Sequence, residues 1–302
     1  MRIAITGGAG FVGRHLAARL EGPVIVSRRA GIDIDDVDAL TAAFQGVDAI
    51  AHCAGINREF GEQTYDRVHV QGTRNVIEAA RRAGVTRIVM LSFLRARPGV
   101  GSGYHESKWE AEELIRASGL EYTILKAAVI YGPGDHMIDH VTRAVRTWPV
   151  FFTVGLRGRT VRPIPVDDLV DVLVAALDGR IDEPTVAVMG AEELPLSDAV
   201  RRIARVAGRR PLFVPVPVWV IRIVAQLTEW LMTVPLVAKA QAQILSEGVA
   251  EPRPWAPEPA DDIRPHGPFS EQSIRAAMPD AGPFCVRDLR LGRRWARRGA
   301  IA

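Results

Sequence analysis

A tyrosine and a lysine four residues apart could act together as a proton donor and its charged neighbour. Tyr104 and Lys108 lie in a stretch with a helical pattern, 103–118, so their side chains share one face of the expected helix. A lysine ammonium near a phenol favours the phenolate and lowers its pKa. A phenol tuned in this way can donate a proton to a carbonyl oxygen, or accept one from an alcohol. Alternatively, Tyr104 is only a packed aromatic side chain of that helix.

A second group of residues could hold phosphate. A glycine-rich turn follows the apolar run 2–6, and a helix is predicted from about residue 11. Glycine lets such a turn close tightly and approach a pyrophosphate, while the N-terminus of the helix offers unpaired N–H groups. The pattern predicts a dinucleotide-binding turn formed by Thr6, Gly7, Gly8, Gly10, Phe11, Val12 and Gly13.

The elements that must position these residues alternate between strands and helices. The strand candidates are apolar and rich in valine and isoleucine, as is typical of strands buried on both faces. Such alternation predicts an α/β fold with a Rossmann-type doubly wound parallel sheet. Between residues 28 and 34 there is room for at most a short strand near Ile32. The predicted strands are 2–6, 23–27, 47–53, 86–91 and 121–127, and the predicted helices between them are 11–21, 35–45, 64–83 and 103–118.

The pattern changes after about residue 130, where prolines become frequent and strands shorter. We expect a smaller C-terminal substrate lobe there, added to the core rather than folded independently. Residues 1–130 would form the dinucleotide-binding core, with 155–180 returning to it, and 131–302 would form mainly the lobe and a tail. The body of the lobe is assigned to 148–166 and 184–247, with an irregular surface segment at 251–268. Helices are predicted at 167–178, 196–207, 217–231 and 236–247.

Several motifs resemble those of the short-chain dehydrogenase/reductase superfamily, especially its extended and atypical members, which include NAD-dependent epimerases and dehydratases. The spacing Thr6-Gly7-x-x-Gly10-x-x-Gly13 is similar to the superfamily's turn. The stretch 209–217 and the apolar residues after it resemble atypical members related to the NADPH-binding accessory subunit of respiratory complex I. Further motifs that resemble the superfamily are 47–55, 72–76, 132–135 and 166–169.

The resemblance implies roles for individual residues. Tyr104 and Lys108 would be the catalytic pair, and Lys108 would also hold the nicotinamide ribose. Ser92, at the end of strand 86–91, would hydrogen-bond the substrate carbonyl, unless it only caps the strand. His69 stands where the family often has asparagine, and we expect a structural histidine there. The loop after strand 47–53 would line the cofactor with Cys53, Ala54 and Gly55.

The end of the second strand bears on the choice of cofactor. Enzymes that use NAD usually offer a carboxylate to the adenosine ribose, whereas those that use NADP offer arginine to the 2′-phosphate. Ser27, Arg28 and Arg29 follow this strand, so the sequence favours NADP(H) and leaves NAD(H) open. The two arginines could also be a solvated loop. Asp33 competes for a ribose contact, although the resemblance implies that Asp33 and Ile34 lie beside the adenine.

Together these residues predict an NADP(H)-dependent oxidoreductase that acts on a small carbonyl or alcohol substrate, with Tyr104 donating or accepting the proton. One alternative is a non-catalytic NAD(P)H-binding sensor or an accessory protein of a membrane complex. The short, glycine-containing connection between Ser92 and Tyr104 favours it, because atypical members without known catalysis have such loops. Another alternative is a sugar-nucleotide epimerase or dehydratase, which would use the same catalytic residues.

Composition limits the partners and surroundings that we expect. The net charge is only +3, so bulk electrostatics give no reason to expect nucleic acid as a partner. Cys53 and Cys285 belong to no Cys-x-x-Cys unit, so we expect neither a metal site nor a disulfide framework. The chain starts directly with a predicted strand and shows no leader pattern, which favours a cytoplasmic protein.

Two features leave contacts with larger partners open. A stripe of apolar residues in helix 217–231 is typical of core packing, and a membrane- or quinone-facing surface on the C-terminal lobe is the alternative. The arginines of 287–298 predict a solvated helical face, with peripheral contact to an anionic membrane as the alternative. Helices 64–83 and 103–118 pair into dimers in many relatives, which leaves a homodimer open. The apolar stripe consists of Trp219, Ile223, Leu227 and Leu231.

Overall fold

The computed structural model describes most of the chain, in two compact units. The described residues are 1–154, 159–217, 219–220, 223, 226, 256–280 and 282–285. The first unit comprises Met1–Ile130, Ile164–Ala191 and Glu251–Gly267, and the second comprises Tyr131–Pro163, Glu192–Ala250 and Pro268–Ala302. The predicted helix 236–247, most of helix 217–231 and the arginines of 287–298 lie outside the described residues.

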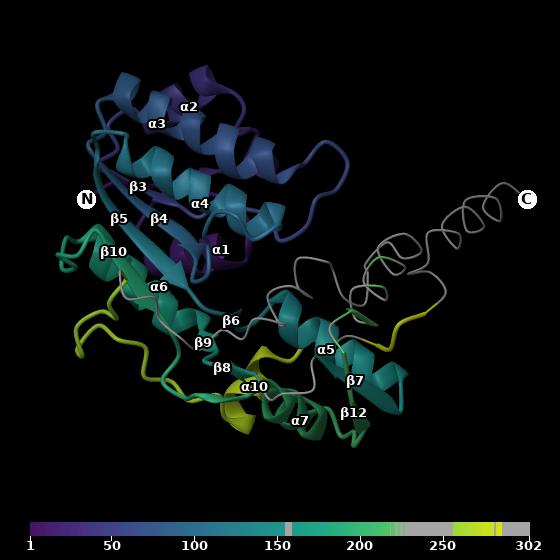
Figure 1. Cartoon of the computed structure of the whole chain (residues 1–302). Coiled ribbons are helices and arrows are strands. Elements are labelled where there is room, and N and C mark those ends of the chain that lie inside the picture. The colour runs from purple at the N-terminus through teal and green to yellow at the C-terminus, as the bar shows by residue number, and fades with distance from the viewer. Residues whose placement is uncertain are drawn as a thin grey trace, which may run out of the picture. The chain divides into compact units, whose positions relative to one another are not determined.

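The first unit is built around a six-stranded sheet in which every pair of neighbours is parallel (Figure 1). Most of its residues are apolar and buried, which fits strands covered on both faces. The predicted α/β class and parallel sheet are confirmed. The strands in spatial order are β10 (Thr185–Val188), β5 (Glu121–Ala127), β4 (Arg87–Phe93), β3 (Ala49–His52), β1 (Ile3–Thr6) and β2 (Val24–Val26).

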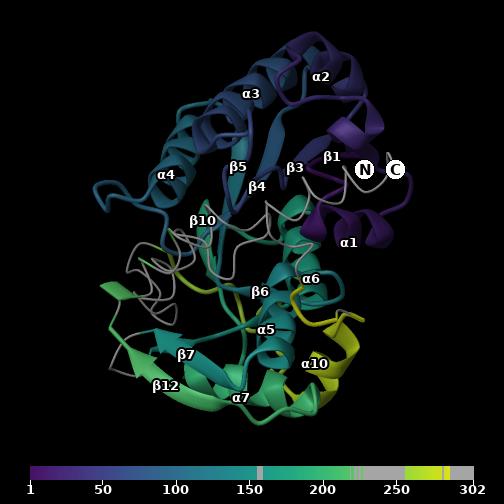
Figure 2. The same ribbon diagram turned by 90° about the vertical axis from the view of Figure 1, so that its right-hand side faces the viewer.

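Helices cover both faces of this sheet, as Figures 1 and 2 show. One face carries α2 (Val37–Phe44), α3 (Gly72–Ala83) and α4 (Gly103–Arg116), whose apolar side chains pack with strand residues in one core cluster. The other face carries α1 (Phe11–Arg19) and α6 (Val166–Leu177), which contact each other.

Two short helical segments interrupt the predicted pattern. The predicted helix 64–83 begins as a π-helix, η2 (Asp66–Gln71), and continues as α3. After β2 the chain makes a single 3₁₀ turn, η1 (Arg28–Ala30), before α2 begins at Val37. This turn matches the trimmed connection that the short spacing predicts, and the described residues contain no strand at Ile32.

The assignment of 184–247 to the C-terminal lobe was wrong at its start. Thr185–Val188 forms β10, which pairs with β5 and completes the core sheet. A buried run of four residues is too short to distinguish a core strand from a lobe strand by its pattern. The expected surface segment 251–268 also has a buried part, because Ala256 is buried and the Pro257 carbonyl accepts a hydrogen bond from Ala187 of β10. This segment therefore covers an edge strand.

The described part of the second unit contains helices and short strands. Helix α5 (His136–Thr147), which the sequence analysis missed, is capped by Asp135, whose carboxylate accepts a hydrogen bond from the Ile138 amide. The described residues of this unit also include α7 (Leu196–Val206) and α10 (Glu271–Ala277). Its strand pairs are β7 (Val150–Val154) with β12 (Leu212–Val216), which are parallel, and β8 (Thr160–Val161) with β11 (Leu194–Pro195), which are antiparallel.

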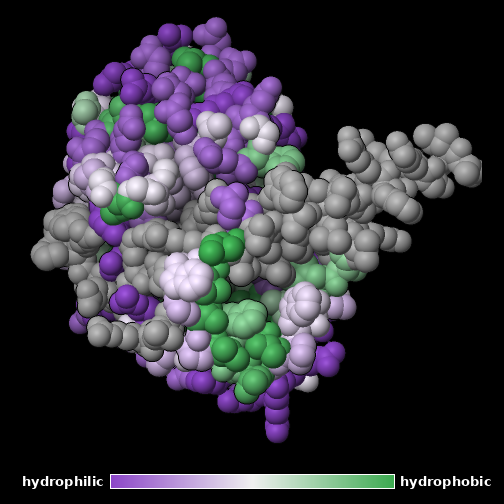
Figure 3. Space-filling model, turned by 45° about the vertical axis from the view of Figure 1, so that its right-hand side comes forward, coloured by the Kyte–Doolittle hydropathy of each residue, from purple (hydrophilic) through white to green (hydrophobic). Residues whose placement is uncertain are grey.

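β6 (Ile130–Tyr131) pairs with β9 (Ile164–Pro165). Figure 3 shows a hydrophobic area on the face turned to the viewer, and the exposed apolar side chains of the second unit include Trp148, Phe152 and Leu212. Within the described residues, no helix is long and apolar enough to span a membrane.

Candidate functional site

The glycine turn after β1 has the geometry that its spacing predicts. Gly7 has a φ of 68°, and its carbonyl accepts a hydrogen bond from the Gly10 amide at 2.8 Å. A methyl group at Gly13 would lie 2.3 Å from the Gly7 carbonyl oxygen, so α1 can approach β1 only without that side chain. Helix α1 has no side-chain cap at Gly10 and no acidic residue in its first turn. Its N-terminal amides therefore remain suited to a diphosphate.

The same turn touches the loop after β3. A methyl group at Gly7 would lie 2.7 Å from the Ala54 Cα atom, and one at Gly55 would lie 3.0 Å from the Lys108 Nζ atom. Because β1 and β3 are parallel neighbours, their carboxyl ends meet at one edge of the sheet. The structure therefore brings together the glycine turn, the loop Cys53–Gly55 and Lys108, which the sequence places far apart.

A buried hydrogen-bond chain next to the turn was not predicted. His52 Nδ1 lies 2.7 Å from the Thr6 hydroxyl, and His52 Nε2 lies 3.0 Å from the Thr73 hydroxyl. Thr73 donates to the His69 carbonyl, so it accepts from His52, and His52 accepts from Thr6. Burial lowers the pKa of His52 to about 3, so this histidine is neutral. The Thr6 hydroxyl, which we expected to contact the cofactor, thus donates to His52 inside the protein.

Lys108 reaches the carboxyl ends of two strands. Its ammonium donates to the Leu91 carbonyl at 3.3 Å and lies close to Gly55. Burial lowers the pKa of Lys108 to about 8, and the nearby Cys53 and Glu112 raise it in part. Burial also raises the pKa of Cys53 to about 12, so Cys53 is a neutral thiol beside this lysine.

Tyr104 lies one helical turn before Lys108, among other rings. Its ring centroid is 5.4 Å from that of Phe93, 5.7 Å from that of Tyr65 and 5.8 Å from that of His69. Burial raises the pKa of Tyr104 above its ordinary value, and Tyr65 adds to the shift. The expected lowering of this pKa by Lys108 was therefore wrong for the structure described, because desolvation by the surrounding rings dominates.

The structure does not direct Ser92 toward Tyr104. The Ser92 hydroxyl donates to Glu112 Oε1 at 2.6 Å, inside a buried cluster in which Lys126 Nζ also contacts Glu112 at 2.6 Å. The next residue of β4, Phe93, packs against Tyr104 instead. The cluster could have been suspected from Glu112, which follows Lys108 by four residues on the same helix face. Its partner Lys126 carries no such sequence signal.

His69 has the structural role that was expected. Its Nε2 atom accepts a hydrogen bond from the Ile56 amide at 3.1 Å, so its Nδ1 atom carries the proton and donates to the Ser107 hydroxyl at 2.8 Å. Burial lowers the pKa of His69 well below its ordinary value, which keeps the ring neutral. This histidine ties the loop after β3 to helix α4.

The residues after β2 are placed by local hydrogen bonds. The Ser27 hydroxyl accepts from the Ala30 amide and closes η1, leaving Arg28 and Arg29 exposed. The Ile34 carbonyl accepts from Asn75 at 3.1 Å, and a methyl group at Gly72 would lie 2.9 Å from Ile34 Cδ1. Helix α3 therefore fixes the position of Ile34, which is expected beside the adenine.

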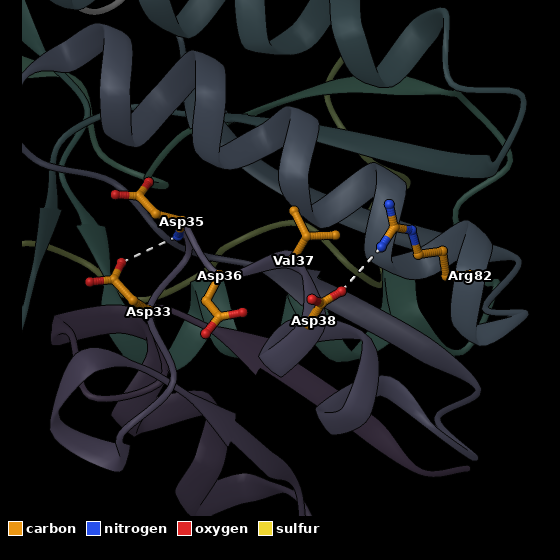
Figure 4. A pocket seen from close by; sticks show the side chains of 6 residues that line it. All are labelled: Asp33, Asp35, Asp36, Val37, Asp38 and Arg82. Carbon is orange, nitrogen blue, oxygen red and sulfur yellow. Dashed lines mark hydrogen bonds and ion pairs between the residues drawn. The ribbon is translucent and has the colours of Figure 1, made fainter.

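An acidic pocket lies beside these residues (Figure 4). It has a volume of about 580 Å³, and its single lining arginine, Arg82, contacts Asp38 at 3.2 Å. Asp33 accepts from the amide of Asp35. The carboxylates disfavour a phosphate in this pocket. The pocket is lined by Asp33, Asp35, Asp36, Val37, Asp38 and Arg82.

The parallel sheet and its glycine turn define a dinucleotide-binding protein of the Rossmann class. A family model described as NAD(P)H-binding matches residues 24–178, which is more than half of the chain. The chain therefore belongs to this NAD(P)H-binding family, within the extended short-chain dehydrogenase/reductase superfamily, whose members include NAD(P)-dependent oxidoreductases.

Individual relatives agree with this assignment. The chain is 30% identical over 241 residues to a ceramide reductase of Caulobacter vibrioides, a match that covers 71% of this chain and 73% of the relative. It is 31% identical over 225 residues to the uncharacterized protein Rv2047c of Mycobacterium tuberculosis, covering 69% of this chain. That match spans only 23% of the relative, so the chain corresponds to about a quarter of its length.

Solved structures share the fold. A UDP-glucose 4-epimerase of Thermus thermophilus, solved with NAD, has a TM-score of 0.65 at 19% identity, with 92% of this chain and 97% of that chain covered. At this identity the likeness concerns the fold alone.

Proposed function

We propose that the chain is an NADP(H)-dependent oxidoreductase that interconverts a carbonyl and an alcohol on a small molecule. The observation that carries the proposal is the placement of Lys108 Nζ beside Gly55, at the sheet edge where Gly7 contacts Ala54. A glycine cradle for a diphosphate and a lysine for a ribose thus belong to one site. Tyr104 lies one turn before Lys108 on the same helix face.

In the proposed reaction each residue has a limited task. The glycine turn would hold the diphosphate of NADPH, which supplies the hydride when bound. Lys108 would hydrogen-bond the nicotinamide ribose, and the Tyr104 hydroxyl would donate a proton to the substrate carbonyl oxygen. Ser92 would have to leave Glu112 to reach a substrate, so we assign the proton transfer to Tyr104 without it.

The surroundings of Tyr104 suggest an apolar substrate. Phe93 and Tyr65 pack against the ring that would donate the proton, and neither side chain carries a charge. Apolar walls of this kind favour apolar substrates over sugar nucleotides. Named relatives include a ceramide reductase and a 3 beta-hydroxysteroid dehydrogenase/Delta 5-->4-isomerase, and we propose by analogy a lipid-like carbonyl compound.

A second candidate is a non-catalytic NAD(P)H-binding protein. Two observations favour it: the Ser92 hydroxyl is directed to Glu112, and burial raises the pKa of Tyr104. A phenol with a raised pKa donates its proton less readily. This candidate predicts NADPH binding without consumption of NADPH.

Replacing Tyr104 with phenylalanine separates the two candidates. We expect Tyr104→Phe to lower NADPH oxidation with apolar aldehydes and ketones by at least about 100-fold, because one proton donor is removed. The affinity for NADPH should stay unchanged in a fluorescence titration. Tyr122→Phe is the matched control, since Tyr122 lies near the amino end of β5, whereas the proposed site lies at the carboxyl ends of the parallel strands. Equal turnover in wild type and Tyr104→Phe would refute the assignment, whereas NADPH binding without any oxidation would favour the non-catalytic candidate.

A further inference from the structure

The two parallel strands β7 and β12 form a ribbon with two different faces. In their register, Val150 lies beside Leu212 and Phe152 lies beside Val214. Side chains alternate along a strand, so these four residues share one face, and Phe151 and Phe213 share the other. The guanidinium of Arg201, a residue of α7, lies over the Phe213 ring, 4.9 Å from its centroid. The ribbon face that carries Phe151 and Phe213 is therefore directed toward α7. The face with Val150 is therefore directed away from α7.

This second face is apolar, and its two largest side chains are exposed. Phe152 is 53% exposed and Leu212 is 66% exposed, although both are large apolar side chains. Trp148, just before β7, is 53% exposed. We call Trp148, Val150, Phe152, Leu212 and Val214 the β7–β12 face; the hydrophobic area in Figure 3 lies on this part of the surface. Contiguous exposed apolar patches mark contact surfaces in soluble domains.

Positive charge accompanies the β7–β12 face. Arg209 and Arg210 directly precede β12, are exposed, and form no ion pair with the described residues. Both strands run in the same direction, so these arginines and Trp148 lie at the same end of the ribbon. No aspartate or glutamate occurs between residues 140 and 154 or between 199 and 217. Apolar side chains together with these arginines fit an occupant that is both apolar and negatively charged.

We propose that the β7–β12 face docks the protein on a lipid bilayer with anionic headgroups. Phe152 and Leu212 would enter the boundary between headgroups and acyl chains, Trp148 would lie at headgroup level, and the two arginines would pair with phosphates. A second copy of this chain fits the charge less well, because it would present the same arginines. The inference is independent of the proposed hydride transfer.

Vesicle sedimentation tests the docking. The full chain should sediment with vesicles of phosphatidylcholine containing about 30% phosphatidylglycerol, and far less with pure phosphatidylcholine. Phe152→Ser with Leu212→Ser should lower the bound fraction about fivefold or more. Arg209→Gln with Arg210→Gln should remove the gain from phosphatidylglycerol. Phe60→Ser is the matched control, because Phe60 is 61% exposed in the first unit and should leave binding unchanged.

Two results would overturn the proposal. One is equal sedimentation of wild type and the arginine variant, which changes only exposed side chains and should fold normally. The other is absence of vesicle binding together with a dimer, seen by light scattering, that Phe152→Ser with Leu212→Ser converts to a monomer. That second result would assign the β7–β12 face to another copy of the chain.

Discussion

Single residues at the sheet edge show how far side-chain chemistry can be predicted from spacing. Tyr104 and Lys108 share a helix face as their spacing requires, because α-helical geometry alone decides that. The direction of the Ser92 hydroxyl depends on Glu112 and Lys126, which the fold brings together from α4 and β5. The pKa of Tyr104 depends on ring neighbours from other elements. Such effects follow from packing and leave no local pattern.

The arginines after β2 carry the proposed preference for NADP(H). Arg28→Gln with Arg29→Gln should raise the Kd for NADPH about tenfold or more, because charge-assisted bonds to the 2′-phosphate are lost. The Kd for NADH should hardly change, since NADH lacks that phosphate. Isothermal titration calorimetry with both cofactors measures the ratio.

Arg82→Gln provides the control for this pair. Arg82 contacts Asp38 and Glu78, so its charge is already balanced, and its loss should leave both Kd values unchanged. An equal effect of the Arg28/Arg29 replacement on NADPH and NADH would show that these arginines do not read the 2′-phosphate.

At the level of elements, alternation and glycine placement were the informative signals. Five strands and five helices of the core were predicted close to their observed bounds, the fifth helix being 167–178, which is α6. The strands were predictable because buried parallel strands are continuous apolar runs. β10 and α5 were missed: one has four residues, and the other follows a stretch rich in glycine and proline. The hydrogen-bond chain from Thr6 through His52 to Thr73 was also missed, because its members belong to three separate elements.

This hydrogen-bond chain should make stability depend on acidity. The pKa of His52 is lowered to about 3 in the folded protein, so below its ordinary value of 6.5 the unfolded chain binds more protons. The stability contributed by neutral His52 is present above pH 6.5 and is lost as the pH falls toward 3. Between about pH 6.5 and 4.5 the loss amounts to about 2 kcal/mol.

His52→Gln isolates this contribution. Glutamine keeps a donor and an acceptor but does not titrate, so urea unfolding of the variant should show a smaller decrease over the same pH range. Parallel pH dependence of the wild type and His52→Gln would mean that His52 does not stay neutral in the folded protein.

At the scale of the whole molecule, the chain divides into a nucleotide-binding unit and a second unit. Residues 164–191 return to the first unit, close to the 155–180 expected from the sequence. The segment Glu251–Gly267 also belongs to the first unit, and no pattern in the sequence predicts this. The match of the NAD(P)H-binding family model to 24–178 covers most of that core. All proposals about chemistry depend on a dinucleotide held by the turn after β1.

Amide hydrogen exchange with and without NADPH tests that dependence most directly. Mass spectrometry of the exchanged chain should show slower exchange at residues 7–13 and 53–55 with millimolar NADPH, because ligand phosphates and a closed loop protect those amides. Unchanged exchange at the glycine turn with both NADPH and NADH would contradict the account.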